Sequence, residues 1–301
     1  MIRTAICGAD EPVAGELLRL LINHPDVDIK WLEAPARDGA PLDAVHKGFI
    51  GETALVMQGQ EGDLDDVDVL FLCRTGAGAG TQFMRQHDEL PPQLRIIDLS
   101  PDFRGDNEWG FTYGLSELNR KHIVRNCQRV ACPSATAAAV LPALLPLAKA
   151  LLLAGPITVS VDAAQPLQPA VDELARALSS LQTSFASEIT IHTRAAEAQP
   201  RGVKATVQFN CGVDEALLRQ LYDDYYDDHN FTFVTRHEIS TLDVVNTCKC
   251  IMRIDKSGSA VIVTSVIDPW LKGSAGTAVH NMNLLFGLHE KVGLTLKSSA
   301  I

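Results

Sequence analysis

Residues 130–147, VACPSATAAAVLPALLPL, are the stretch that most constrains how this chain can fold. A turn with proline and serine is followed by an alanine and leucine run, which predicts a helix at the junction between two halves of the chain. The first turn of such a helix has N–H groups without helical partners and carries the positive end of the helix dipole. This position lowers the pKa of a thiol and favours an anionic substrate, so we expect chemistry at this junction.

The residues before this stretch have the pattern of an α/β domain. An apolar strand, Ile2–Cys7, runs through Gly8 into a segment up to Leu21 with apolar residues at helical spacing. Val67–Cys73 is almost continuously apolar, as is typical of a strand buried on both faces. Two further strands are expected at Asp26–Glu33 and Arg95–Asp98. The pattern predicts a parallel, Rossmann-like sheet from the first 133 residues.

The residues after the junction are dominated by strands. Their β-branched residues and their alternation predict an α+β domain with a mixed or antiparallel sheet, which also contains an amphipathic helix at Asp214–Tyr226. The expected strands are Ile157–Asp162, Ser187–Thr193, Lys204–Cys211, Thr247–Asp255 and Ser259–Asp268.

Composition excludes several classes of function. The chain has 301 residues, 46% of them hydrophobic, which is enough for two domains, and its formal charge of −11 argues against nucleic acid or an anionic membrane as partner. No segment approaches the ~20 apolar residues of a membrane span, and the N-terminus is not a secretory signal, so we expect a cytoplasmic protein. The seven cysteines are scattered, which indicates reduced thiols, and the lone Cys248-Lys-Cys250 motif does not predict a metal site.

Four segments resemble the N-acetyl-γ-glutamyl-phosphate reductase family. The junction resembles that family's N-P-G-C-[YF]-x-T-A-x-x-L-x-L-L-P-L segment, and Asp98–Arg104 (DLSPDFR) and Tyr113–Asn119 (YGLSELN) resemble D-L-S-x-D-[FY]-R and Y-G-L-P-E-L-N. Val266–Gly287 is similar to V-I-D-N-L-x-K-G-A-A-G-Q-A-V-x-N-M-N-L-M-F-G. The resemblance implies a helix that returns to the first domain, so we expect one domain from residues 1–133 and 276–301 and a substrate and dimerisation domain from residues 134–275.

The resemblance implies a reaction whose two central residues this chain lacks. Active relatives use a cysteine nucleophile, a histidine that exchanges protons and NADPH as hydride donor. Ala135 stands at the cysteine position and Ala170 at the histidine position, while Glu173 matches the family's glutamate after the histidine. Cys132, three residues before Ala135, is an alternative nucleophile that lacks a partner base. The other histidines offer no evident replacement.

The resemblance also implies which residues line the substrate crevice. Ser100, Arg104 and Tyr113 fall in the two retained motifs that lie near this crevice in the relatives. Arg104 can pair with a carboxylate or a phosphate of a substrate. The alternative is a structural salt bridge to Asp98, Asp102 or Glu117.

The expected cofactor site is altered. In the family the first turn reads G-x-x-G-x-x-G; here Gly8 remains, but Glu11 and Ala14 replace the second and third glycines. A carboxylate ~4 Å from a phosphate costs about 4 kcal/mol at an effective dielectric of 20. Glu33 would repel the 2′-phosphate of NADP, and Asn281 would be a polar contact to the nicotinamide. The alternative for this turn is a plain connection from strand to helix.

A loop of the cofactor site is missing as well. The strand that ends near Asp162 runs in the relatives into an S-G-x-S-G-A-G loop, whereas here Gln165-Pro-Leu-Gln-Pro169 follows and about two dozen further residues are absent. Gly76–Gly80 is flexible enough to lie beside a ligand. We therefore expect that no cofactor binds, or that NADP binds if Cys132 has taken over the nucleophile's role.

Three hypotheses follow. The first is a homologue of the reductase that has lost catalysis and acts by binding or association. The second is an active, NADP-dependent reductase of arginine biosynthesis that uses Cys132, and the third is a changed activity without nicotinamide. The resemblance implies a homo-oligomer built on the second domain's sheet, and the retained assembly surfaces suggest a hetero-oligomer with an active paralogue.

Overall fold

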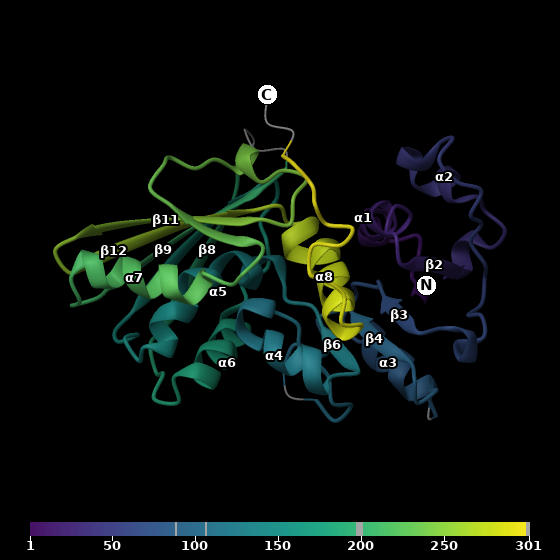
Figure 1. The fold of residues 1–301 in the computed structure, drawn as a ribbon, viewed down its shortest axis with the longest axis horizontal. Helices are drawn as coiled ribbons and strands as arrows, with labels where there is room; N and C mark the ends of the chain where they lie inside the picture. Colours follow the sequence, from purple (N-terminus) through teal and green to yellow (C-terminus); the bar gives the residue numbers. More distant parts are fainter. Residues whose placement is uncertain (88, 106, 197–200, 299–301) are drawn as a thin grey trace. The chain divides into compact units, whose positions relative to one another are not determined.

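The chain folds into two compact units. The computed structural model describes residues 1–87, 89–105, 107–196 and 201–298. The first unit comprises Met1–Pro133 and Ser274–Leu294, and the second comprises Ser134–Gly273 with the described residues from Thr295 onward (Figure 1). In the part of the chain that the structure describes, no helix is long and apolar enough to cross a membrane.

The first unit is built on a six-stranded parallel sheet. The strands follow the order β2-β1-β3-β4-β6-β5. The sheet therefore extends from β1 in both directions, and the carboxyl ends of β1 and β3 flank the point at which such folds bind ligands. The strands are β1 (Ile2–Cys7), β2 (Val27–Glu33), β3 (Val69–Leu72), β4 (Arg95–Asp98), β5 (Thr112–Tyr113) and β6 (Arg129–Ala131).

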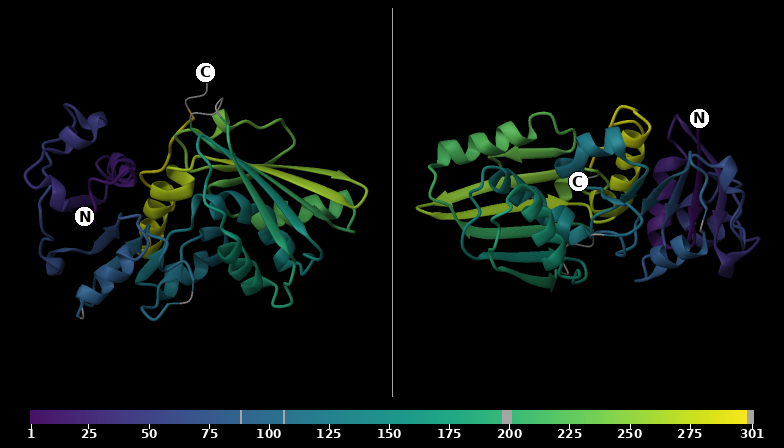
Figure 2. Two further views of the ribbon diagram at one scale, coloured as in Figure 1. Left: turned by 180° about the vertical axis from the view of Figure 1, so that it is seen from behind. Right: turned by 90° about the horizontal axis from the view of Figure 1, so that it is seen from below.

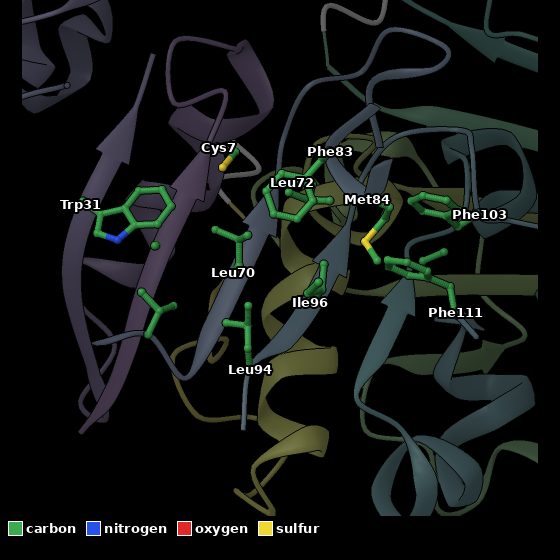
Figure 3. Packing of buried hydrophobic residues seen from close by; sticks show 13 residues of the cluster. Cys7, Trp31, Leu70, Leu72, Phe83, Met84, Leu94, Ile96, Phe103 and Phe111 are labelled. Atoms are coloured by element: carbon green, nitrogen blue, oxygen red, sulfur yellow. The ribbon is translucent and has the colours of Figure 1, made fainter. Parts of the chain in front are cut away.

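Helices cover both faces of this sheet. On one face, Phe83 and Met84 of α3 pack with Leu70 and Leu72 of β3 and with Ile96 of β4 (Figure 3). On the other face, α8 packs against β4, α1 and α4. The helices of this unit are α1 (Pro12–Leu21), α2 (Leu42–Val45), α3 (Ala79–Gln86), α4 (Ser116–Asn126) and α8 (Gly276–Leu285), with short 3-10 turns at Pro35–Arg37, Lys47–Phe49 and Leu64–Asp66.

The second unit is built on a mixed sheet in the order β10-β11-β12-β9-β7-β8. The pairs around β12 and β9 are antiparallel, whereas the two outer pairs, β10 with β11 and β7 with β8, are parallel. Buried and exposed residues alternate along β9, which is typical of a sheet covered on one face. The strands are β7 (Ile157–Ala163), β8 (Ile189–Ala195), β9 (Val203–Asn210), β10 (Thr232–Thr235), β11 (Cys250–Ser257) and β12 (Ala260–Ile267).

Three helices pack on one face of this second sheet: α5 (Ala135–Lys149), α6 (Val171–Leu181) and α7 (Glu215–Tyr226) (Figure 2). The central one, α5, is buried along almost its whole length. A 3-10 turn at Thr241–Asp243 and a π-helical turn at Leu271–Ala275 complete the secondary structure.

The buried helix α5 contains two prolines, Pro142 and Pro146. Proline has no N–H, so Pro146 cannot donate to the carbonyl of Pro142 one turn earlier. The hydroxyl of Tyr226 donates to this carbonyl at 2.6 Å, and the hydroxyl of Tyr222 donates to the next one, that of Ala143. The Tyr226 hydroxyl thus provides a donor where Pro146 interrupts the helical hydrogen bonding of α5, and the Tyr222 hydroxyl donates to the adjacent carbonyl.

The predicted fold class is confirmed, because a parallel Rossmann-like sheet and a mixed sheet with helices are both present. The prediction that Thr247–Asp255 is one strand is wrong at its start: β11 begins at Cys250. Asn246 has a left-handed backbone (φ 59), and the Thr247 hydroxyl donates to Val244 at 2.7 Å, so these residues form a turn.

The glycine segment Gly76–Gly80, expected to be flexible enough to lie beside a ligand, is partly helical. Gly78, with φ 87, is the N-cap of α3, and Gly80 lies inside this helix. A Cβ at Gly80 would lie 2.7 Å from Phe103 and 2.8 Å from the Ser100 hydroxyl, so this glycine allows close packing of α3.

Candidate functional site

The turn between β1 and α1 is held by the end of β2. We call residues Gly8–Ala14 the phosphate turn. Gly8 has φ 77, and a Cβ there would lie 2.7 Å from Arg74 Cγ, so the position requires glycine. The backbone N–H groups of Gly8 and Ala9 both donate to the carbonyl of Glu33, at 3.0 and 2.8 Å.

The Glu33 carboxylate has two partners. Its Oε2 accepts from the Gly8 N–H at 3.0 Å, and its Oε1 forms an ion pair with the guanidinium of Arg74. The side chain of Glu33 is 5% exposed and that of Arg74 is 45% exposed. Arg74 follows β3, so the acid expected near a ribose is fixed between the ends of β1 and β3. This cation moderates the repulsion that Glu33 would exert on a 2′-phosphate.

The two residues that replace glycines in the phosphate turn lie in different surroundings. Glu11 is the half-buried N-cap of α1, and its side chain accepts no hydrogen bond from the helix. Pro12 follows at the first helical position. Ala14 is completely buried on the inner face of α1. Glu11 therefore changes the charge at the helix N-terminus, while Ala14 belongs to the core.

The motif Asp98–Arg104 begins at the end of β4 and is hydrogen-bonded to the start of α3. The Ser100 hydroxyl donates to Asp98 Oδ2 at 2.8 Å, and Asp102 accepts from the N–H groups of Gly78 and Thr81 at the start of α3. Asp98 is completely buried, and its Oδ1 has no hydrogen-bond partner among the residues that the structure describes. Burial raises the pKa of Asp98 to about 7, with the Ser100 hydrogen bond opposing the shift.

Arg104 is held by main-chain carbonyls. Its Nε donates to Cys132 O at 3.0 Å and its Nη2 to Leu99 O at 3.4 Å. Among the residues that the structure describes, these carbonyls rather than Asp98, Asp102 or Glu117 are the hydrogen-bond acceptors of Arg104. Tyr113, the third residue expected at the crevice, is half-buried on β5 beside β6.

Cys132 is a buried thiol at the end of β6. Burial raises its pKa to about 12, and the nearby carboxylate of Asp98 adds to the shift. Its side-chain hydrogen-bond neighbour is Asn281 of α8, whose Nδ2 lies 3.9 Å from Sγ and donates to Gly114 O at 2.9 Å. Because the thiolate is the nucleophilic form, this environment disfavours attack by Cys132.

Asn281 connects α8 to the sheet. It is completely buried, its amide donates to the carbonyl of Gly114, and within the described part of the chain its Oδ1 has no hydrogen-bond partner. A Cβ at Gly114 would lie 2.6 Å from Asn281 Nδ2, so this approach requires glycine. These contacts give Asn281 a packing role in the first unit, and a contact to nicotinamide remains a prediction.

The positions of the missing thiol and imidazole lie in the second unit. Ala135 is the first residue of α5, after the N-cap Ser134, and Ala170 is the N-cap of α6. The Ser134 N–H donates to Glu173 Oε1 at 2.9 Å, and the Thr136 hydroxyl donates to Gln168 O at 2.9 Å. These hydrogen bonds hold the start of α5 next to the start of α6. Ala135 and Ala170 lie at these two helix starts.

Glu173 is therefore the anion at the N-terminus of α5. A carboxylate at this end of a helix is favoured by the dipole and by the free N–H groups. The Ala135 methyl group packs closely against Gly273, since a Cβ at Gly273 would lie 2.9 Å from Ala135 Cβ. The described residues include no group of three or more His, Cys, Asp or Glu side chains that could hold a metal.

The histidines that could replace the missing base are either exposed or in contact with neighbouring residues. His192 is exposed on β8, and His280 bonds to Glu290 at 2.7 Å. His289 accepts from its neighbour Lys291 at 3.2 Å. His229 lies 3.9 Å from Asp228, and His237 is exposed before the turn at 241–243.

Sequence reasoning missed Arg74 and the roles of Asp98 and Glu173. Arg74 had one signal, since it directly follows a buried strand at the ligand-binding edge of the sheet. Asp98 lay within a recognised motif, but its unpaired oxygen depends on packing. Pro200, part of a P-R-G-V segment similar to the relatives' P-R-G-I, lies outside the described residues.

Comparison with known proteins agrees with this geometry. Residues 3–126 match "Semialdehyde dehydrogenase, NAD binding domain", and residues 171–269 match "Semialdehyde dehydrogenase, dimerisation domain". The chain is 40% identical to an N-acetyl-γ-glutamyl-phosphate reductase of Phocaeicola vulgatus and 38% identical to one of Parabacteroides distasonis, and each alignment covers 100% of both chains. This chain belongs to the N-acetyl-γ-glutamyl-phosphate reductase family.

Solved structures show the same fold at low identity. Aspartate semialdehyde dehydrogenase II of Vibrio cholerae, in complex with ASA, superimposes with a TM-score of 0.73 at 17% identity over 95% of this chain and 98% of that one. The NADP complex of the Candida albicans aspartate semialdehyde dehydrogenase gives a TM-score of 0.72 at 15% identity, over 95% of this chain and 98% of that one. The reductase family thus shares its fold with the aspartate semialdehyde dehydrogenases.

Proposed function

We propose that this member of the reductase family has lost catalysis and acts by association. The observation that carries the proposal is the pair Ala135 and Ala170. Neither methyl group can attack a carbonyl or exchange a proton, and the hydrogen bonds of Ser134 and Thr136 bring both positions to the starts of α5 and α6. Without a thiol there is no thioester to reduce.

The competing candidate is an active, NADP-dependent reductase that uses Cys132. Three observations weigh against it: the thiol is buried, its pKa is raised to about 12, and its polar contact is an amide rather than a base. At neutral pH such a thiol is almost fully protonated. We propose NADP as a cofactor only for this candidate. The match to the NAD-binding domain supports membership of the family rather than binding of the cofactor by this chain.

The expected result of an activity assay is no turnover. The assay follows reduction of NADP with N-acetylglutamate semialdehyde and phosphate, with an intact family member as positive control. We expect a rate below ~0.1 per second, against about 1–1000 per second for typical enzymes.

Cys132→Ser decides between the two candidates, and Cys127→Ser is its matched control because Cys127 is the half-buried thiol. Turnover above ~0.1 per second that is lost in Cys132→Ser and kept in Cys127→Ser would establish the active reductase. Turnover kept in both variants would also refute the loss of catalysis.

The association that we propose uses the sheet of the second unit. The family has a dimerisation domain there, which supports a homo-oligomer. On the face that α5, α6 and α7 leave uncovered, cross-strand pairs such as Thr206 with Thr264 and Gln208 with Ile262 remain half or fully exposed. We further propose that an active paralogue can take one place in this oligomer, and a cytoplasmic location stays a prediction.

Co-expression with an intact reductase from the same source tests the mixed oligomer. One chain carries an affinity tag, and we expect capture of both chains, because an isologous surface shared by paralogues permits exchange. Thr206→Arg, which places a charge on the uncovered face, is expected to abolish capture of the partner. Recovery of only the tagged chain, under conditions where subunits exchange, refutes the mixed oligomer.

A further inference from the structure

We infer that the phosphate turn (Gly8–Ala14) keeps a backbone competent to bind a nicotinamide dinucleotide and is closed by one side chain, Glu11, so that one substitution reopens it. The inference rests on the proposed absence of cofactor binding. It concerns which residue causes this absence and whether the change is reversible.

The backbone of the turn is retained. Gly8 has φ 77, and its N–H donates to Glu33 Oε2 at 3.0 Å, which holds the acid at the end of β2. The turn follows the carboxyl end of β1, which lies beside the carboxyl end of β3 in the sheet. This is the point of the sheet at which dinucleotides bind in such folds.

Ala14 is not the obstacle. Its side chain is completely buried on the inner face of α1, so it packs in the core rather than toward a ligand. The close approach that demands glycine falls one residue later, because a Cβ at Gly15 would lie 2.6 Å from His46 Nδ1. His46 in turn bonds to the carbonyl of Ala9 at 2.8 Å and so supports the turn.

Glu11 is the obstacle. Its backbone, with φ −69 and ψ 145, is an ordinary extended conformation, so no rearrangement of the turn accompanies the side chain. The carboxylate accepts no hydrogen bond from α1, and Glu11 is the N-cap of this helix. Its charge therefore stands at the N-terminus of the helix that follows β1, where the phosphates of a dinucleotide bind in such folds.

The charge of Glu11 is sufficient to prevent binding. A phosphate brought within ~4 Å of the carboxylate, at an effective dielectric of about 20, is bound about a thousandfold more weakly. The side chain also occupies space that the second glycine of the family leaves free. Removing both effects leaves the positive end of the α1 dipole without an adjacent carboxylate. The N–H groups of Gly8 and Ala9 remain donors to Glu33.

Calorimetric titration with NADPH and with NADH tests the inference on the full chain. We expect the wild type to bind neither below ~1 mM, and Glu11→Gly to bind at least one about 100-fold to 1000-fold more tightly. Glu11→Gln, which keeps the bulk and removes the charge, should lie between them. Glycine is well tolerated at an N-cap, and thermal unfolding of each variant verifies that it is folded.

Two control variants test whether the effect is specific to position 11. Glu16→Gln removes the same charge farther along α1, where Glu16 pairs with Arg19 at 2.8 Å, and Ala14→Gly changes the third glycine position alone. Neither should improve binding. The inference is overturned if folded Glu11→Gly gains no affinity, if either control gains as much, or if the wild type binds in the micromolar range. None of these results restores turnover, so the proposed loss of catalysis is judged separately by the activity assay.

Discussion

Replacing Tyr222 and Tyr226 together by phenylalanine is expected to lower the free energy of unfolding by about 2–4 kcal/mol. Both hydroxyls are buried and donate to carbonyls of α5, those of Ala143 and Pro142. Phenylalanine keeps the rings and removes only the donors. The Pro142 carbonyl then stays buried without a donor, which costs about 1–3 kcal/mol, whereas the Ala143 carbonyl, whose helical donor position is Leu147, loses one hydrogen bond worth about 0.5–1.5 kcal/mol. Urea unfolding of the single and double variants measures the loss.

Pro146→Ala supplies the control for this prediction. Alanine at position 146 restores the N–H that Pro142 O lacks, so Tyr226→Phe should cost less than about 1 kcal/mol in that background. The double-mutant cycle therefore predicts a coupling energy between Tyr226 and Pro146. Equal costs of Tyr226→Phe in both backgrounds would show that the hydroxyl does not compensate for the proline.

The second large effect is a loss of stability as the pH rises, caused by Asp98. Burial raises the pKa of this carboxyl from 3.8 to about 7 in the folded chain. The folded state thus binds a proton that the unfolded state has already released between these values. The contribution of Asp98 to stability is fully present below about pH 4 and is lost as the pH rises through about 7.

Between pH 5 and pH 8, Asp98 alone is expected to lower the free energy of unfolding by roughly 2–3 kcal/mol. Asp98→Asn cannot ionise and keeps an oxygen that can accept from Ser100. The stability difference between wild type and variant, measured by urea unfolding across this range, isolates the carboxyl from all other groups. A difference that stays constant with pH would mean that Asp98 is not protonated in the folded chain.

Hydrophobic periodicity in the sequence was sufficient to predict the two sheets. The continuous apolar run that contains β3 and the alternation along β9 depend only on which faces are buried, so they are visible in a single chain. The start of β11 was not predictable in this way, because a left-handed residue at Asn246 and a side-chain hydrogen bond at Thr247 end the pattern. The short strands β5 and β6 carry too few residues for a periodic signal.

For the site, the sequence by itself determined which chemical groups are missing. Ala135, Ala170 and Glu11 can be read directly from the sequence, because the identity of a residue does not depend on folding. Only the tertiary structure decided what surrounds them: that Cys132 is buried beside Asp98 and Asn281, that Arg74 pairs with Glu33, and that tyrosines of α7 reach the prolines of α5. The physical reason is that desolvation and hydrogen-bond pairing act between residues far apart in the chain, whose approach is set by packing and leaves no local pattern.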